Sequence, residues 1–287
     1  MKYITLAALA VLFGMFSIPQ EPAAPTQEKK QTSETQRPEK PATGTVGKTA
    51  KTAPEGATPE GKKAEPNSKP ATAKEPKSNL FWIFLKTGKS TEGVAAEKVE
   101  SMQAEHIANF KRLASEGKLL TAGPMQDPEK MLRGMVIVKA ENYAEIEEMF
   151  SPDPYVQAGY LKTETQRMGI SHGKINTQIT PQGMSEFLMV MFDESKDKTK
   201  LSKDETSETE LSLKSLTENE ELRLAITFLN QEKPRRGVLV FRKPKDDESR
   251  KGILGRISEI PAVKNGKWRT RVLPLLMGKG SLNDSQR

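Results

Sequence analysis

The segment SPDPYVQAGY, residues 151–160, returns in altered form as SEIPAVKNGKW, residues 258–268. The proline, the valine and the glycine of the first segment (Pro154, Val156 and Gly159) match those of the second without a gap, 107 residues further on. Asp153, however, is replaced by Ile260 in the second copy. The chain therefore repeats the segment but not its carboxylate, which predicts a duplicated fold with one feature confined to the first copy.

The residues before and after the first segment predict the order βαββαβ. An apolar run at residues 80–85 is typical of a buried strand, and apolar side chains spaced by three and four over residues 92–116 indicate a helix. This order is the ferredoxin-like split unit. The remaining predicted elements are strands at residues 119–122, 134–138 and 160–168 and a helix at residues 141–150.

The second half of the chain repeats this order. Residues 113–138 match the sequence 103 residues further on, and the offset then grows to 107, which places an insertion around residues 243–251. A four-stranded sheet with helices on one face must have its other face covered, and two copies can cover each other. We therefore predict an α+β fold in which tandem ferredoxin-like βαββαβ repeats form a pseudo-dimeric α+β barrel within one chain.

The N-terminal part of the chain differs from the repeats. In residues 1–18, Lys2 precedes an apolar run that suits a signal peptide or an N-terminal membrane anchor, so the protein is expected to be exported and periplasmic or membrane-tethered. Residues 19–78 lack Phe, Tyr, Trp, Leu, Ile and Met, which predicts a disordered Pro/Lys/Glu/Thr-rich linker. The further boundaries are a first domain at 79–170, a linker at 171–184, a second domain at 185–278 and a flexible tail at 279–287.

Charge and composition argue against several classes of function. The formal net charge is +7, but Lys and Glu are interspersed and no nucleic-acid motif is present, so no nucleic-acid partner is expected. The absence of Cys excludes disulfides and thiolate zinc sites. The two histidines, His106 and His172, lie far apart in the sequence, so neither a metal nor another cofactor is expected.

Two stretches of the first repeat resemble a known family. AEHIANFKRLASEGKLLTAGPM, residues 104–125, followed by SPDPYVQAGY, resembles the YCII-related family of the dimeric α+β barrel superfamily. The resemblance covers about residues 80–170, and residues 185–278 resemble the family as a degenerate copy. It implies that His106 and Asp153 form a His–Asp active site. Some relatives are associated with dehalogenation or isomerisation of aromatic-degradation intermediates, and the exported tandem arrangement gives no ground for transferring a substrate.

His106 and Asp153 are the catalytic candidates. His106 lies on the apolar stripe of its helix, so its side chain should point inward, where Asp153 could be its partner. A buried His–Asp pair fixes one imidazole tautomer and suits general acid–base catalysis. The same pair could instead hold the last strand of the repeat against its first helix, and the sequence leaves both interpretations open.

The ligand-binding candidates are Gly123, Pro124 and Tyr155. Gly123 could let a backbone amide approach a ligand closely, although LTAGP could also be a hairpin corner. Arg133 recurs as Arg236, which indicates a structural part. The sequence thus predicts an exported YCII-like protein whose acid–base site acts on a small molecule. The alternative is a non-catalytic exported ligand-binding or scaffold protein, and the N-terminal segment could attach either one to a membrane.

Overall fold

The computed structural model describes residues 79–177, 183–196, 200–230 and 232–282. The signal or anchor segment predicted at residues 1–18 and the linker predicted at residues 19–78 lie outside the described residues. The first repeat contains β1 (Asn79–Thr87), α1 (Ala96–Ser115), β2 (Leu119–Pro124), β3 (Leu132–Ala140), α2 (Tyr143–Phe150), α3 (Pro154–Gln157) and β4 (Leu161–Gly173). The second contains β5 (Met184–Glu194), α4 (Lys203–Leu216), β6 (Leu222–Phe228), β7 (Arg235–Arg242), α5 (Asp247–Ser258), α6 (Pro261–Lys264) and β8 (Trp268–Gly278).

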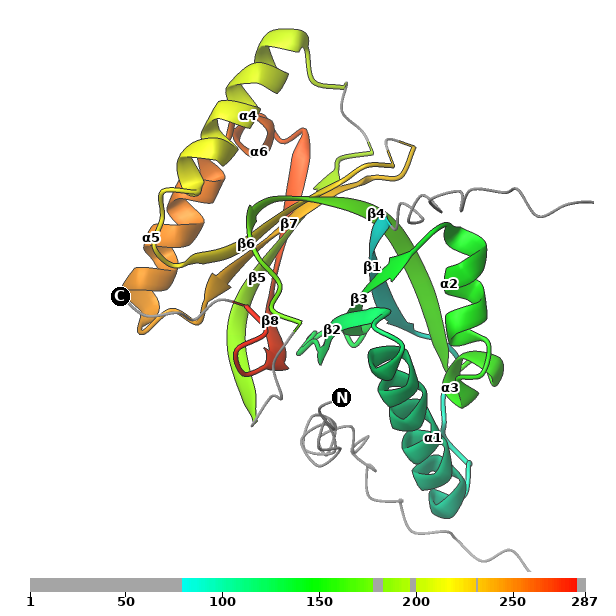
Figure 1. The fold of residues 1–287 in the computed structure, drawn as a ribbon. Helices are drawn as coiled ribbons and strands as arrows, with labels where there is room; N and C mark the ends of the chain where they lie inside the picture. Colours follow the sequence, from blue (N-terminus) through cyan, green and yellow to red (C-terminus); the bar gives the residue numbers. More distant parts are fainter. Residues whose placement is uncertain (1–78, 178–182, 197–199, 231, 283–287) are drawn as a thin grey trace, which may run out of the picture. The chain divides into compact units, whose positions relative to one another are not determined.

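All eight strands belong to one antiparallel sheet with the order β2-β3-β1-β4-β6-β7-β5-β8 (Figure 1). Each repeat supplies four neighbouring strands in the ferredoxin-like order, and β4 of the first repeat pairs with β6 of the second. The two end strands also meet, through a bridge between Met125 and Leu275. The strands therefore close into a barrel, which confirms the predicted tandem fold.

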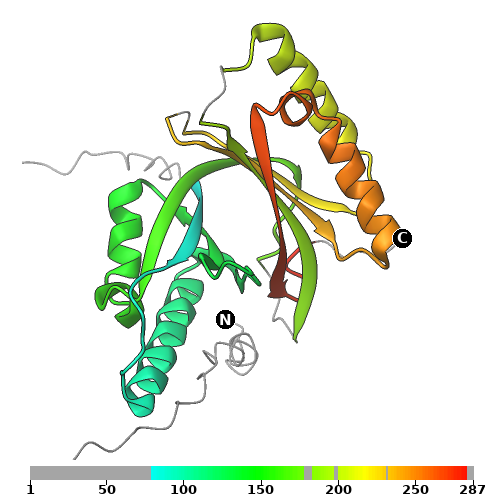
Figure 2. The ribbon, with the colours of Figure 1, turned by 180° about the vertical axis from the view of Figure 1, so that it is seen from behind.

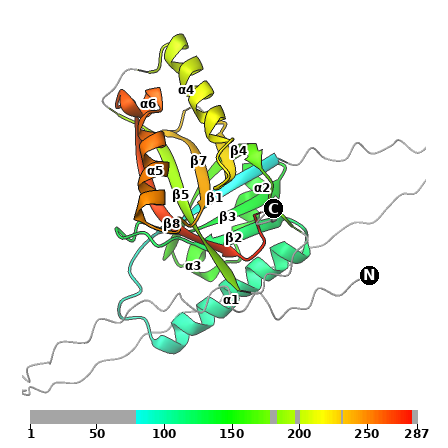
Figure 3. The same ribbon diagram turned by 90° about the vertical axis from the view of Figure 1, so that its left-hand side faces the viewer.

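The hydrophobic core has three parts. Apolar side chains of both repeats fill the barrel interior, among them Trp82 and Phe84 of β1 and Phe228 of β6. A second cluster packs α1 and α2 against the first repeat's strands, and a third packs α4 and α5 against the second repeat's strands. Seen from behind, the long β4 curves from one set of strands towards the other (Figure 2). A quarter turn shows strands between the two groups of helices (Figure 3).

Two predicted boundaries were wrong. β4 does not end at residue 168 but continues through His172 to Gly173, because this extension pairs with β6. His172 therefore lies in a strand and not in a linker that begins at residue 171. The predicted flexible tail also begins too early, since Leu282 is fully buried and forms a bridge with Ile175. Residues 283–287 lie outside the described residues.

The inserted residues of the second repeat lie near α5, which is longer than the equivalent helix α2 of the first repeat. α5 has 12 residues, whereas α2 has 8. Each helix begins with a side-chain cap, from Asn142 in the first repeat and from Asp246 in the second. The insertion thus lengthens a surface helix and leaves the strand order unchanged.

The repeats meet along two seams. The first seam, between β4 and β6, is a ladder that runs from Met168 opposite Phe228 to Gly173 opposite Leu224. The second seam, between β8 and β2, has the Met125–Leu275 bridge and a hydrogen bond from Gln126 N to Pro274 O, 3.0 Å. The position of β2 that would continue this ladder is Pro124, which has no N–H to donate.

Gly123 lets the backbone of β2 approach β8 closely. A Cβ atom at Gly123 would lie 1.7 Å from the carbonyl oxygen of Leu276. Only glycine fits there without displacing one of the two strands. The LTAGP stretch therefore has a place in closing the barrel.

At each seam a carboxylate of the first repeat pairs with an arginine of the second repeat. Asp127 accepts hydrogen bonds from the backbone N–H groups of Glu129, Met131 and Leu132 and from Arg271 Nη2 at 2.7 Å. Burial alone would raise the pKa of Asp127, but these hydrogen bonds and the charge of Arg271 outweigh it and lower the pKa. Both repeats therefore meet at an ionised Asp127.

Glu164 is the carboxylate that joins the two repeats at the first seam. Its carboxylate contacts the Arg235 guanidinium of the second repeat and Lys86 Nζ at 3.1 Å. Burial would raise the pKa of Glu164, but the hydrogen bond and charge of Arg235, with Lys86, hold the pKa below its ordinary value.

We expect Gly123→Ala to lower the melting temperature, because the added methyl group must push β2 away from β8 at the second seam. Gly252→Ala is the matched control, since Gly252 lies in α5 with nothing near its Cβ position, and alanine favours a helix there. Thermal unfolding followed by circular dichroism compares the two. Equal melting temperatures for both variants would contradict the close approach at Gly123.

We also expect the barrel to lose stability in acid through Glu164 and Asp127. Their pKa values in the folded protein lie below the ordinary 4.5 and 3.8, so the unfolded chain takes up the protons first as pH falls. The stabilisation is complete above these ordinary values and is lost as pH falls through the folded-state pKa values. Melting temperatures from about pH 7 to about pH 2.5 measure it, and Glu164→Gln should make the decline less steep. An equally steep decline in Glu164→Gln would show that the seam pair contributes nothing.

Candidate functional site

Helix α1 positions His106 on the side that faces the sheet. Its buried residues recur at helical spacing, and His106 is 3% exposed. The imidazole ring packs against Phe110, with ring centroids 4.4 Å apart, and against the edge of Tyr155 at 5.7 Å. His106 is thus held between two aromatic side chains in the layer between α1 and α3.

Asp153 reaches His106 from the start of α3. It is the N-cap of this short helix, and its Oδ1 accepts hydrogen bonds from Tyr155 N at 3.0 Å and Val156 N at 3.3 Å. Its Oδ2 lies 2.5 Å from His106 Nδ1, and Asp153 is fully buried. We assign both carboxylate oxygens of Asp153 as acceptors, which puts the shared proton on His106 Nδ1 and leaves Nε2 as the other functional nitrogen.

Tyr155 and Gln103 extend this pair into a polar cluster. The Tyr155 hydroxyl lies 3.3 Å from Val99 O and 3.3 Å from Gln103 Oε1. Among the described residues, Gln103 Nε2 is buried without a hydrogen-bond partner. A buried N–H donor left unpaired is costly, which makes Gln103 a candidate to bind a ligand oxygen.

The charges of Asp153 and Arg133 act on the Tyr155 hydroxyl in opposite directions. Burial raises the pKa of the Tyr155 hydroxyl, the negative charge of Asp153 raises it further, and the positive charge of Arg133 opposes both. Tyr155 therefore stays a neutral hydroxyl at physiological pH. The sequence interpretation missed Gln103 and assigned Arg133 a structural part; the signal for Gln103 was its place three residues before His106, on the same helical face.

The structure brings together some predicted site residues and separates others. His106, Asp153 and Tyr155 form one cluster through the contacts above. Gly123 and Pro124 lie instead at the second seam, where the close contact with Leu276 accounts for the glycine. A ligand-binding part for these two residues stays a prediction.

The second repeat replaces the pair by another capping arrangement. Thr209 of α4 occupies the position of His106, and Ile260 that of Asp153. The Thr209 hydroxyl oxygen accepts a hydrogen bond from Ala262 N at 3.2 Å, whereas Ile260 caps α6 with no side-chain hydrogen bond and is 1% exposed. Thr209 thus satisfies a helix-start N–H that Asp153 satisfies in the first repeat. The fold keeps α6 without the carboxylate.

The helix pairs of the two repeats are also connected differently. In the first repeat, Asn109 Nδ2 and Arg112 Nη2 both donate to the backbone oxygen of Met149 in α2, at 3.1 and 3.2 Å. Ser212 and Ser215 replace them in the second repeat and donate to carbonyl groups of their own helix.

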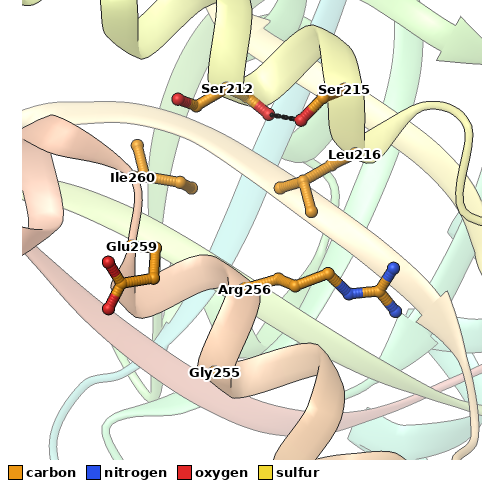
Figure 4. A pocket seen from close by; sticks show the side chains of 7 residues that line it. All are labelled: Ser212, Ser215, Leu216, Gly255, Arg256, Glu259 and Ile260. Carbon is orange, nitrogen blue, oxygen red and sulfur yellow. Dashed lines mark hydrogen bonds between the residues drawn. The ribbon is translucent and has the colours of Figure 1, made fainter.

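A hollow of about 340 Å³ lies between α4 and α5 as a result (Figure 4). Leu216 and Ile260 lie between the two helices, and Arg256 extends from α5 to one side while Glu259, just after the end of α5, lies on the other. The hollow belongs to the second repeat and does not include the His–Asp pair.

Within the described ranges, no three His, Asp or Glu side chains come close enough to hold a metal ion. No helix in the same ranges is long and apolar enough to cross a membrane.

Comparisons with known proteins identify the first repeat. Residues 80–165 match the family model of the YCII-related domain. No curated protein matches the chain.

Several solved structures are similar, all with TM-scores below 0.5. A proposed monooxygenase from Lactobacillus acidophilus NCFM is 12% identical, with 71% of this chain and 95% of that chain covered and a TM-score of 0.44. A proposed chlorite dismutase is 9% identical, with coverages of 72% and 96% and a TM-score of 0.47. A variant of chlorite dismutase from Candidatus Nitrospira defluvii is 9% identical, with coverages of 69% and 92% and a TM-score of 0.45. Over residues 80–165 the first repeat of this chain is thus similar to the YCII-related domain.

Proposed function

We propose that His106 and Asp153 form a proton-transfer site that acts on a small molecule. The observation that carries this proposal is the 2.5 Å contact between Asp153 Oδ2 and His106 Nδ1, with Oδ1 held by two backbone N–H groups. The carboxylate cannot turn away from the imidazole without breaking both. His106 is therefore oriented before any substrate binds, which general acid–base catalysis requires.

The polar groups around the pair favour a substrate with a carbonyl or carboxylate oxygen. Gln103 Nε2 is a buried donor that needs an acceptor, and Arg133 supplies positive charge near Tyr155. An oxygen bound by these groups would gain negative charge when His106 Nε2 removes a proton from the neighbouring carbon. The electrons of the broken C–H bond form a C=C bond to the carbonyl carbon, and the C=O electrons move onto that oxygen. In a substrate with a further C=C bond conjugated to this enolate, return of the proton to the far carbon completes an isomerisation without a redox partner.

The site is proposed for the first repeat alone. Thr209 and Ile260 stand at the positions of the pair in the second repeat, and neither can exchange a proton as an imidazole does. Each chain would therefore hold one such site. Export of the protein, inferred from residues 1–18, stays a prediction from the sequence.

The alternative is a non-catalytic ligand-binding or scaffold protein, and the burial of the pair favours it. His106 is 3% exposed and Asp153 is fully buried, so a substrate reaches His106 only if neighbouring side chains move aside. In this alternative the His106–Asp153 pair only holds α3 against α1. Measurements of protein stability and of the rate of proton transfer in variants of the pair distinguish the two functions.

We expect the protein to catalyse exchange of carbon-bound hydrogen for deuterium in small ketones or keto acids in D₂O, followed by proton NMR. His106→Asn should reduce the exchange rate by about 10²–10⁴-fold, the usual contribution of a positioned acid–base group. The matched control is Thr209→Ser at the equivalent position, which retains a hydroxyl cap and should keep the wild-type rate.

The result that contradicts catalysis is equally clear. If His106→Asn exchanges as fast as the wild type, or if neither protein catalyses exchange while His106→Asn melts far below Thr209→Ser, the pair is structural. The scaffold alternative then holds.

A further inference from the structure

The two seams are related by the pseudo-twofold symmetry of the barrel. At the first seam Leu229 N donates to Arg167 O at 2.8 Å, and at the second Gln126 N donates to Pro274 O at 3.0 Å. These hydrogen bonds join equivalent positions, because the hairpin residues lie 103 apart and the strand residues 107 apart. Each seam therefore joins the last strand of one repeat to the β-hairpin of the other.

The two seams carry opposite charges at equivalent positions: the last strand of the first repeat presents an acid and the last strand of the second repeat presents a base. Glu164 of β4 and Arg271 of β8 are equivalent, 107 residues apart. Glu164 pairs with Arg235 in the second repeat's hairpin region. Arg271 pairs with Asp127 at 2.7 Å and Glu129 at 2.8 Å in the first repeat's hairpin. One repeat thus presents an acid where the other presents a base.

The ion pairs at both seams are partly buried. The Arg235 side chain is 11% exposed, and its guanidinium lies 4.4 Å from the centroid of the Phe84 ring in the first repeat. It also contacts Asp193 at 3.3 Å, while the Asp127 side chain is fully buried. Partly buried charges are screened less than exposed ones, so an unpaired or like-charged neighbour there is costly.

Pairing of two like repeats would bring like charges together. In a pair of first repeats, Glu164 would face Asp127 and Glu129, and the position of Arg235 would hold the apolar Leu132. In a pair of second repeats, Arg271 would face Arg235, Asn230 would replace the buried Asp127, and Glu232 would stand at the position of the exposed Glu129. Each arrangement loses the buried opposite-charge pairs across the seam.

We propose that the exchanged charges at the two seams make the first repeat pair with a second repeat in preference to another first repeat. The partner that this surface fits is the second repeat of the chain. The barrel then contains one YCII-related half and one degenerate half. This pairing rule holds whether or not the His–Asp pair is catalytic.

Two cysteines introduced into the full chain can report whether its two repeats are paired, because the chain has no Cys of its own. Gly169 of β4 and Thr227 of β6 are opposite each other across the first seam. A Cβ at Gly169 meets no atom nearer than Leu229 Cδ2 at 3.9 Å, so cysteine fits there. In Gly169→Cys/Thr227→Cys, mild oxidation should give an intrachain disulfide when the two repeats are paired.

Three charge variants are then compared in this cysteine background. Glu164→Lys sets two cations against each other at the seam and should lower the melting temperature by about 5 °C or more, reduce the intrachain disulfide and produce larger species in light scattering. The double exchange of Glu164→Arg with Arg235→Glu is made together with Lys86→Gln and Asp193→Asn, because Lys86 and Asp193 would otherwise become like-charged neighbours of the exchanged side chains. It restores opposite charges across the seam and should restore the disulfide and the monomer. Glu186→Lys is the control, because it makes the same charge change at an exposed pair with Lys243 inside the second repeat.

The proposal is overturned if Glu164→Lys forms the intrachain disulfide as completely as Glu186→Lys with the same melting temperature. It is also overturned if the double exchange fails to recover what the single reversal loses, even where the single variant does not fold. Loss in Glu164→Lys with recovery in the double exchange supports the pairing rule.

Discussion

The structure depends on covering the face of each four-stranded sheet that its own helices leave open. A βαββαβ unit packs its helices on one face, and the opposite face of β1 carries Trp82 and Phe84. The second repeat covers these side chains with Phe228 and other apolar groups, so neither half has a complete core alone. The seams, the closure at Gly123 and the charge exchange at Glu164 and Arg271 all follow from this need to bring two sheets together.

The second repeat keeps the fold without the His–Asp pair. At the equivalent positions it needs only to fill the buried space and to satisfy the helix start. Thr209 bonds Ala262 N, and Ile260 fills a buried position, so the degenerate copy satisfies both requirements. In the first copy Asp153 also orients His106, beside an unpaired donor on Gln103. A function confined to the first repeat is consistent with this difference.

Much of the fold could be predicted from the sequence because the repeat and the apolar periodicity are local patterns. The pairing of β4 with β6 could not, since the sequence near His172 carries no sign of the strand opposite it. Leu282 is buried by a bridge to Ile175, more than a hundred residues away in the chain. For Gly123 the sequence leaves a ligand contact and a hairpin corner open, and the approach of Leu276 could not be predicted because it depends on barrel closure. The sequence did not predict Gln103 as a site residue, because the lack of a hydrogen-bond partner for its buried side-chain amide depends on the three-dimensional structure.

The central claim is that Asp153 holds His106 in one tautomer, with the proton on Nδ1. The chain has only two histidines, so nitrogen NMR of a histidine-labelled sample can assign both with a His172→Gln variant. We expect His106 to show a slowly exchanging Nδ1-bound proton that disappears in Asp153→Ile, which carries the residue of the second repeat. Averaging of His106 between two tautomers, or the same proton signal in Asp153→Ile, would contradict the account.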